Sequence, residues 1–178
     1  MDHVHEEIVR PRSRTLGNLL YVLCWVVIIL FGAIALITLS SLMAQPRLDL
    51  VLILTLLISG GGAVLLYLRR NHLKVEYEYS FTNGEIDFAR VYNNVRRKEL
   101  GSMKVANVSA CGWVAHPSFR RYISMPGLRK DNWFLNREAN LFYFYFIKSG
   151  NKRVIVIEPT EELAALIKRY ASRGAFQE

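Results

Sequence analysis

Two long apolar stretches dominate the hydrophobic pattern of the chain. Residues 19–43 contain no charged side chain over 25 positions, and residues 50–68 contain none over 19 more. A helix needs about 20 apolar residues to cross a hydrocarbon core about 30 Å thick, so each stretch is long enough to span a membrane. The six residues between them, 44–49, form a short polar break that includes Pro46, Arg47 and Asp49. The pattern therefore predicts a transmembrane α-helical hairpin.

Three consecutive glycines, Gly60, Gly61 and Gly62, lie near the middle of the second predicted span. Small side chains allow two helix backbones to approach each other closely. We interpret these glycines as packing positions between the two helices of the hairpin. The alternative is that they form a flat face for a second copy of the chain or for another membrane protein.

From Lys74 the pattern changes to that of a β-strand. Apolar residues alternate with polar ones from Val75 to Phe81, as expected for a strand with one buried face. Asn83-Gly84 follows, a pair favoured in two-residue type I′ turns because both positions take a positive φ. With this turn Phe81 faces Ile86, and the apolar faces of the two strands coincide.

The next predicted strand, Val95–Leu100, is basic and reads VRRKEL. A two-residue turn at Asn93-Asn94 would place Arg90 opposite Arg97, a repulsive cross-strand pair. We therefore expect a longer loop or a β-bulge at this point, and the register is left open.

Further strands and a closing helix are predicted toward the C-terminus. Residues 105–114 form a weaker candidate strand, and residues 141–147 are apolar on both faces, which is typical of a central strand. A turn at residues 148–151 leads into another strand at 152–157. Residues 159–173 predict an amphipathic helix, acidic near its start and basic near its end.

The segment 114–140 lacks clear periodicity and mixes basic with aromatic residues. Such a mixture suits a loop that binds a membrane surface or a protein partner. The competing interpretation, which we favour, is one or two strands with poor alternation whose aromatic side chains fill the core.

The net charge of +8 is unevenly distributed. Residues from 69 onward contain 19 Lys and Arg against 11 Asp and Glu, a difference of +8, so the rest of the chain sums to zero. Basic residues flank both outer ends of the predicted hairpin: Arg10, Arg12 and Arg14 before it, and Arg69, Arg70 and Lys74 after it. Because Lys and Arg resist translocation, this distribution predicts that both termini are cytoplasmic and that the basic domain adjoins the acidic inner leaflet.

These patterns divide the chain into an N-terminal arm (1–18), a hairpin (19–43 and 50–68) and a domain (72–178). The arm is too short and polar to fold alone, and we expect it to be mobile or to lie on a surface. An antiparallel sheet or partly open barrel closed by one C-terminal helix is typical of a pleckstrin-homology-like (PH-like) domain. The predicted fold class is therefore a membrane α-helical hairpin followed by an α+β domain of this kind.

The chain also resembles a family of small Gram-positive bacterial membrane proteins of unassigned function. The resemblance is carried by three segments: VEYEYSFTNGEIDF (Val75–Phe88), VRRKEL (Val95–Leu100) and FYFYFIKSGNKRVIVIEPTEELAALIKRY (Phe142–Tyr170). It implies a multi-pass protein of the bacterial plasma membrane with a cytosolic PH-like domain. It carries over no catalytic residue.

Candidate chemistry is weak elsewhere in the sequence. Cys111 and His116 are a candidate pair of catalytic nucleophile and general base. Such catalysis also requires an orienting group and oxyanion donors, which the sequence does not indicate. Residues 3–7 (HVHEE) could bind a metal, but no second pair of ligands is evident. We therefore expect no enzymatic activity, no metal and no cofactor.

The function expected from these features is a membrane-anchored scaffold or binding module for anionic lipid or a protein partner at the inner leaflet. The candidate binding residues are basic residues and one tryptophan: Arg96, Arg97, Lys98, Arg120, Arg121, Arg129, Lys130 and Trp133. The alternative function is an accessory subunit of a transport or cell-envelope complex, with the hairpin as its interface. A homo-oligomer stays open, whereas nucleic acid is a weaker partner because Tyr77 and Tyr79 fit a core better than a stacking platform.

Overall fold

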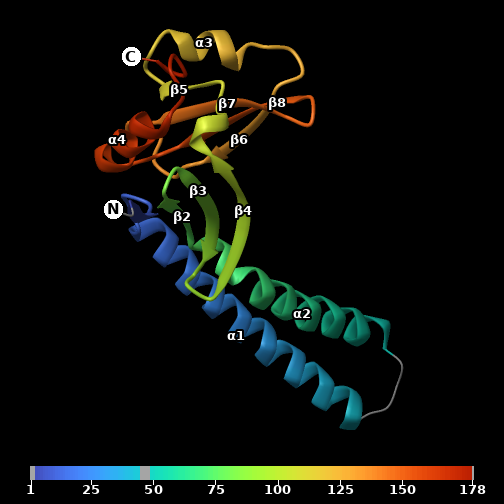
Figure 1. The fold of residues 1–178 in the computed structure, drawn as a ribbon. Coiled ribbons are helices and arrows are strands. Elements are labelled where there is room, and N and C mark those ends of the chain that lie inside the picture. Colours follow the sequence, from blue (N-terminus) through green and yellow to red (C-terminus); the bar gives the residue numbers. More distant parts are fainter. Residues whose placement is uncertain (1–2, 45–48, 178) are drawn as a thin grey trace. The chain divides into compact units, whose positions relative to one another are not determined.

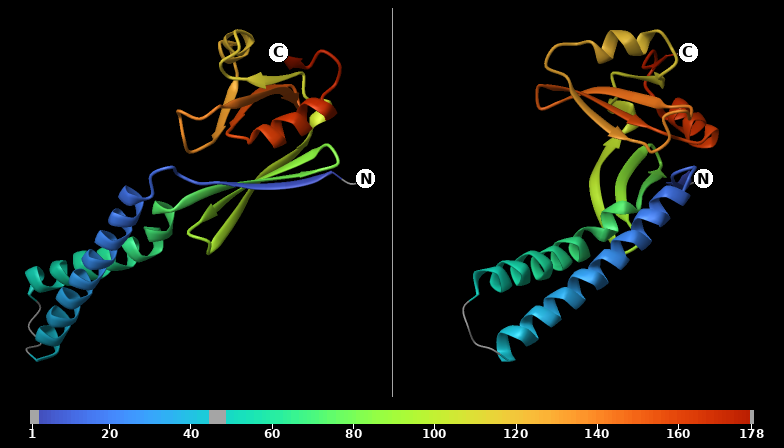
Figure 2. Two further views of the ribbon diagram at one scale, coloured as in Figure 1. Left: turned by 90° about the vertical axis from the view of Figure 1, so that its left-hand side faces the viewer. Right: turned by 180° about the vertical axis from the view of Figure 1, so that it is seen from behind.

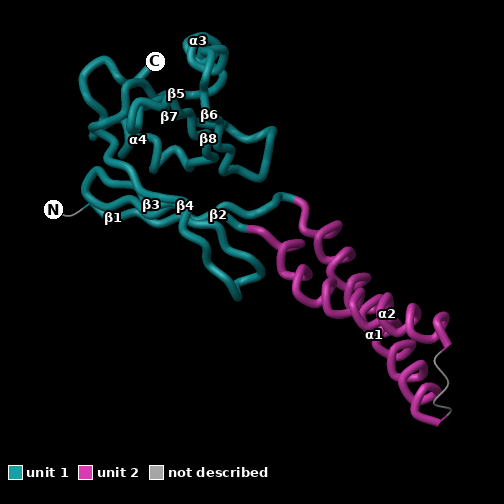
Figure 3. Tube along the Cα trace, turned by 90° about the vertical axis from the view of Figure 1, so that its right-hand side faces the viewer, with its two compact units in different colours: residues 1–12, 76–178 teal, residues 13–75 magenta. Residues whose placement is uncertain are grey.

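The computed structural model describes residues 3–44 and 49–177, and the chain divides into two compact units (Figure 3). Residues 13–75 form the first, which we call the hairpin unit. Residues 1–12 and 76–178 together form the second, which we call the β unit. The N-terminal residues therefore belong to the same unit as the C-terminal domain.

The hairpin unit consists of α1 (Thr15–Ala44) and α2 (Leu50–Arg69), followed by the short 3₁₀-helix η1 (Arg70–Leu73). Both long helices are long and apolar enough to cross a membrane. The side chain of Asp49 caps α2 by accepting a hydrogen bond of 2.8 Å from the backbone N–H of Val51. Pro46 and Arg47 of the predicted connection lie outside the described residues.

The β unit contains two sheets (Figures 1 and 2). The first, sheet A, has the order β1-β2-β3-β4. Its strands follow one another along the chain: β1 (Val4–Val9), β2 (Val75–Thr82), β3 (Glu85–Tyr92) and β4 (Arg96–Lys104).

Strand β1 corrects the prediction that the N-terminal arm is mobile or lies on a surface, because residues 4–9 are an ordered strand of sheet A. It pairs antiparallel with β2 from Val4↔Thr82 to Val9↔Tyr77. The sequence does not reveal β1 as a strand, because polar residues occupy both of its faces and no apolar–polar alternation results. Glu7 points toward the C-terminal helix, where its carboxylate accepts a hydrogen bond of 2.6 Å from the Thr160 hydroxyl.

The turns of sheet A follow the sequence closely. Asn83 and Gly84 have φ values of 48° and 92°, as the Asn-Gly turn requires. Between β3 and β4 the structure has the expected longer loop, with Tyr92 paired to Arg96 around three residues, and the register shifts farther along the strands, after Phe88. The loop avoids the pairing of Arg90 with Arg97 but places Arg90 opposite Lys98, so repulsion between like charges was the wrong reason to expect it. The pairing of Phe81 with Ile86 stays a prediction, although both side chains are fully buried.

Sheet B is mixed rather than purely antiparallel. Its order is β6-β8-β7-β5-β9, and the pairs β6–β8 and β5–β9 are parallel. The strands are β5 (Ala110–Trp113), β6 (Arg129–Trp133), β7 (Phe142–Lys148), β8 (Asn151–Ile157) and β9 (Phe176–Gln177). The strand predicted at 105–114 is shorter than expected, because its first residues form the 3₁₀-helix η2 (Val105–Asn107).

The closing helix α4 (Glu161–Tyr170) is also shorter than the predicted 159–173. Thr160 is its N-cap and accepts a hydrogen bond from the backbone N–H of Leu163. Leu163, Ala164 and Ile167 are its buried residues, as the amphipathic pattern indicated.

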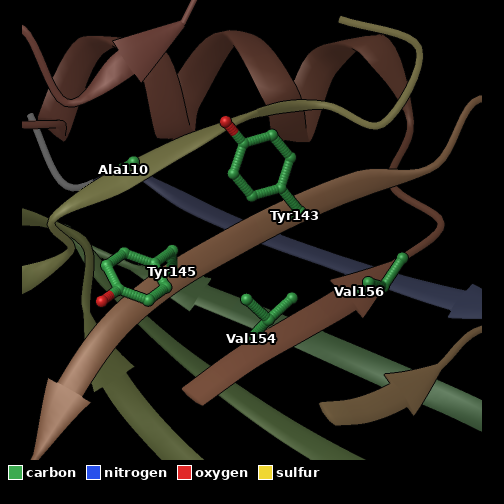
Figure 4. Packing of buried hydrophobic residues seen from close by; sticks show 5 residues of the cluster. All are labelled: Ala110, Tyr143, Tyr145, Val154 and Val156. Carbon is green, nitrogen blue, oxygen red and sulfur yellow. The ribbon is translucent and has the colours of Figure 1, made fainter. Parts of the chain in front are cut away.

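The segment 114–140 folds into α3 (Ser118–Ile123) and β6. Apolar side chains of this segment pack against a buried cluster of sheet B that includes Tyr143 and Tyr145 (Figure 4). The ring of Tyr122 stacks on Tyr145 with centroids 4.7 Å apart, and Phe119 lies 5.1 Å from Tyr143. The aromatic residues of this segment therefore serve mainly as core.

Side chains join the two sheets without closing them into a barrel. The ring of Phe88 in sheet A lies 4.9 Å from that of Trp133 and 6.4 Å from that of Phe144 in sheet B. The buried Tyr79 hydroxyl donates to the backbone carbonyl of Trp133, and burial raises its pKa above the ordinary tyrosine value.

Candidate membrane-binding site

The turn between β3 and β4 leads into an exposed basic segment of sheet A. Arg96, Arg97 and Lys98 begin β4 and all have exposed side chains. Val95, in the turn itself, is 73% exposed. We call residues 93–98 the basic tip. An exposed apolar residue followed by three cations is suited to a membrane surface, where charge attracts the tip and the apolar side chain can insert.

The cations of the basic tip differ in their environments. Arg97 forms an ion pair of 3.0 Å with Glu78 on β2, which offsets part of its charge. Arg96 and Lys98 lie on the opposite face of β4 from Arg97 because side chains alternate along a strand. These two residues are therefore the better candidates for binding anions.

The basic tip lies at the end of sheet A from which the chain continues into the hairpin unit. Val9 pairs with Tyr77 at that end of β1 and β2, and Tyr77 accepts a hydrogen bond of 2.6 Å from Arg90 on β3. Only five residues, 10–14, separate β1 from α1, and only Lys74 separates η1 from β2. Chain connectivity thus ties this end of the sheet to the apolar helices.

Most of the other predicted binding residues lie elsewhere in the β unit. Arg120 and Arg121 belong to α3, which lies at the opposite end of the unit from the β3–β4 turn (Figures 1 and 2). Arg129 and Lys130 lie on β6, the edge strand of sheet B. The eight predicted residues therefore do not form one continuous surface.

Trp133 does not belong to an exposed binding surface. Its side chain is 7% exposed and packs against Phe88 between the sheets. The sequence suggested exposure because Trp133 follows several charged residues, but it occupies an inward-facing position on β6. The apolar residue that is exposed, Val95, was missed. Its position between an Asn-Asn turn and three cations was the signal that could have identified it.

Aromatic rings hold cations at one end of the hairpin unit. The guanidinium of Arg70 lies 3.6 Å from the ring centroid of Tyr67 and 5.1 Å from that of Trp25. The ammonium of Lys74 lies 4.3 Å from the ring of Tyr21. Cations stacked on Tyr and Trp are typical of the headgroup region of a membrane.

The glycines of α2 differ in what surrounds them. A Cβ placed on Gly62 would lie 2.6 Å from the ring of Phe31 in α1, and one on Gly60 would lie 4.0 Å from the Cβ of Ala35. Around Gly61, no heavy atom within the described ranges comes within 4 Å of such a Cβ. Gly62 thus gives α1 and α2 a close contact, whereas Gly61 faces away from α1.

The structure defines the surroundings of the residues considered for catalysis and metal binding. Cys111 is fully buried, and burial raises the pKa of its thiol to about 12, so little reactive thiolate exists at neutral pH. His116 contacts Ser118, with Nδ1 2.7 Å from the hydroxyl oxygen. Among residues 3–44 and 49–177, no group of three or more His, Cys, Asp or Glu side chains could hold a metal ion.

Comparison with known proteins agrees with this architecture. Residues 1–177 match the bacterial PH-like domain family DUF6106. The chain belongs to this family. No curated protein and no solved structure matches it. The match covers the hairpin as well as the sheets, so the β unit is a PH-like domain whose sequence is interrupted by two apolar helices. DUF6106 is a family of unknown function, and PH-like domains are typically non-catalytic.

Proposed function

We propose that this DUF6106 protein is a membrane-anchored binding module whose basic tip engages anionic lipid headgroups at the cytoplasmic face of the bacterial plasma membrane. The observation that carries the proposal is the position of the basic tip at the end of sheet A that continues into the two apolar helices. The exposed Val95 and the cations Arg96 and Lys98 supply the two interactions that such a surface offers.

Strand pairing supports a topology with two spans. Because β1 precedes α1 and β2 follows α2, their pairing in one sheet requires both ends of the hairpin to lie on the same side of the membrane. The basic residues at those ends favour the cytoplasmic side. A reporter fused after the last residue is expected to be active in the cytoplasm, and an active periplasmic or extracellular reporter would contradict this topology.

The lipid contact can be tested in the full-length chain reconstituted into nanodiscs. An environment-sensitive dye is attached to Val95→Cys in a Cys24→Ser background, where the buried Cys111 reacts poorly. We expect the dye emission to shift to the blue when phosphatidylglycerol is added to phosphatidylcholine, and the shift to decrease at high salt. Each cation near an anionic surface contributes about 1 kcal/mol, so Arg96→Glu with Lys98→Glu should weaken the contact about tenfold or more.

The matched control is Arg120→Glu with Arg121→Glu. It makes the same change in net charge on α3, at the other end of the β unit, and should leave the blue shift intact. Identical emission in the two lipid mixtures would contradict the proposal. So would an equal loss in the α3 variant, because the effect would then depend on total charge rather than on the basic tip.

A further inference from the structure

The β unit contains a cleft between its sheets that the proposed membrane contact does not use. Its volume is about 430 Å³, within the usual range for small-molecule sites. Core residues of both sheets line it, among them Phe88 from sheet A and Trp133 and Ile155 from sheet B. The cleft exists because the two sheets do not close into a barrel.

Two irregularities of β4 shape the wall of this cleft. Phe88 pairs with Gly101 and Ala89 with Glu99, so Leu100 is the extra residue of a β-bulge. Leu100 and Gly101 both line the cleft. Gly101 has a φ of 134°, and no heavy atom of the described residues lies within 4 Å of a Cβ built on it. The bulge therefore turns β4 so that space is left between the strand and sheet B.

The mouth of the cleft is positively charged and partly apolar. Lys104, Lys148 and Arg153 line it together with one carboxylate, that of Glu85, so the lining carries a formal charge of +2. Asp131, which forms an ion pair with Arg153 outside this lining, offsets part of that charge. Ile147 also lines the mouth and is 58% exposed, which is high for an isoleucine in a strand. A site with an apolar floor and a cationic mouth is complementary to a small anion that carries an apolar body.

Arg153 is held in position at the mouth. Its Nη2 donates a hydrogen bond of 2.5 Å to Asp131, and its guanidinium lies 5.8 Å from the ring centroid of Phe146. A side chain anchored in this way loses less conformational entropy when it binds an anion. The cation is therefore preorganised at the point where the apolar floor meets solvent.

We propose that this inter-sheet cleft is a binding site for a small organic carboxylate with an aromatic or short aliphatic body. The apolar body lies against the accessible side chains of Leu100, Met103 and Ile147, with Phe88 and Trp133 buried beneath them. The carboxylate faces Lys148 and Arg153. Lys104 is a weaker contributor because it lies directly opposite the acidic Glu85 in the register of β3 and β4. This site is independent of the basic tip, so it can be tested separately from the lipid contact.

Binding can be measured by fluorine NMR with para-trifluoromethylbenzoate and the full-length chain in zwitterionic nanodiscs. We expect the transverse relaxation rate of the probe to rise above its value with empty nanodiscs. The uncharged para-trifluoromethylbenzamide should show a smaller rise, because it lacks the charge that the cationic mouth attracts. Lys148→Gln with Lys104→Gln should lower the carboxylate effect about threefold, the size expected for partly exposed ion pairs.

Two cavity-filling variants locate the site. Met103→Trp places a large ring in the cleft from the half-buried edge of β4 and should abolish the rise. Ala165→Trp is the matched control: it fills a separate cavity of about 1090 Å³ beside α4 and should leave the rise unchanged. Thermal unfolding of both variants near the wild-type temperature shows that they are folded.

Three results would overturn the proposal: no rise with the wild-type chain, an equal rise with Met103→Trp, or an equal effect of the amide and the carboxylate. The lysine variants keep the test decisive even if Met103→Trp fails to fold. Lipid dependence of the dye at position 95 is measured without this probe, so failure of the cleft proposal leaves the proposed membrane contact standing.

Discussion

Gly84 provides a sharp test of how the β2–β3 turn is joined to the C-terminal helix. A Cβ on this residue would lie 2.7 Å from Cδ1 of Tyr170, the last residue of α4. Its φ of 92° is also unfavourable for alanine. We therefore expect Gly84→Ala to destabilise the β unit through both backbone strain and steric overlap.

The magnitude follows from three contributions. Left-handed backbone costs alanine roughly 1–2 kcal/mol, and overpacking typically costs about 1–3 kcal/mol. The lower entropy of the unfolded alanine chain offsets about 0.4–1 kcal/mol of this. The net loss is about 1–4.5 kcal/mol for Gly84→Ala. Gly127→Ala is the control, because Gly127 has a φ of 71° and the described part of the chain leaves open space around it. Its expected loss is roughly 0–1.5 kcal/mol.

Thermal unfolding of the full-length chain in a mild detergent, followed by tryptophan fluorescence, measures this difference. At about 4 °C per kcal/mol for a domain of this size, Gly84→Ala should unfold about 4–12 °C below Gly127→Ala. In a Tyr170→Ala background most of that gap should disappear, since the overlapping ring is gone. Equal losses for the two glycines, or a gap that persists without the Tyr170 ring, would refute the reasoning.

Three further predictions concern other parts of the molecule. Gly62→Ala should destabilise the α1–α2 hairpin by about 1–3 kcal/mol in a detergent unfolding assay because of overpacking, whereas Gly61→Ala should be neutral or slightly stabilising. Cys111 should react with iodoacetamide only after denaturation, and rapid labelling of the folded chain at neutral pH would contradict its burial and its raised pKa. Glu7→Gln should lower the unfolding temperature of the β unit by several degrees, because the carboxylate that accepts from Thr160 at the N-cap of α4 is lost. An unchanged unfolding temperature would show that this contact between β1 and α4 is energetically unimportant.

The sequence alone determined the elements whose formation depends on neighbouring residues. The helices of the hairpin follow from apolar length, because a chain in hydrocarbon must satisfy its backbone hydrogen bonds locally. The turn at Asn83-Gly84 follows from residues that accept positive φ, and α4 follows from a single apolar face. The three-residue loop after Tyr92 was one of the alternatives that the sequence left open, but charge repulsion did not decide it, because Arg90 lies opposite Lys98.

Only the tertiary structure decided the features that depend on distant partners. The edge strand β1 pairs with residues about 70 positions away, and no local pattern reveals a partner at such a distance. Trp133 lies in a charged stretch, yet it is buried because Phe88 packs against it. The cleft beside Leu100 likewise forms between two separate sheets, and the sequence does not show how these sheets are arranged. A local sequence pattern determines the backbone conformation of an element and which of its faces is apolar. Which side chains are buried, and what shape a site has, depends on the other part of the chain that packs against that face.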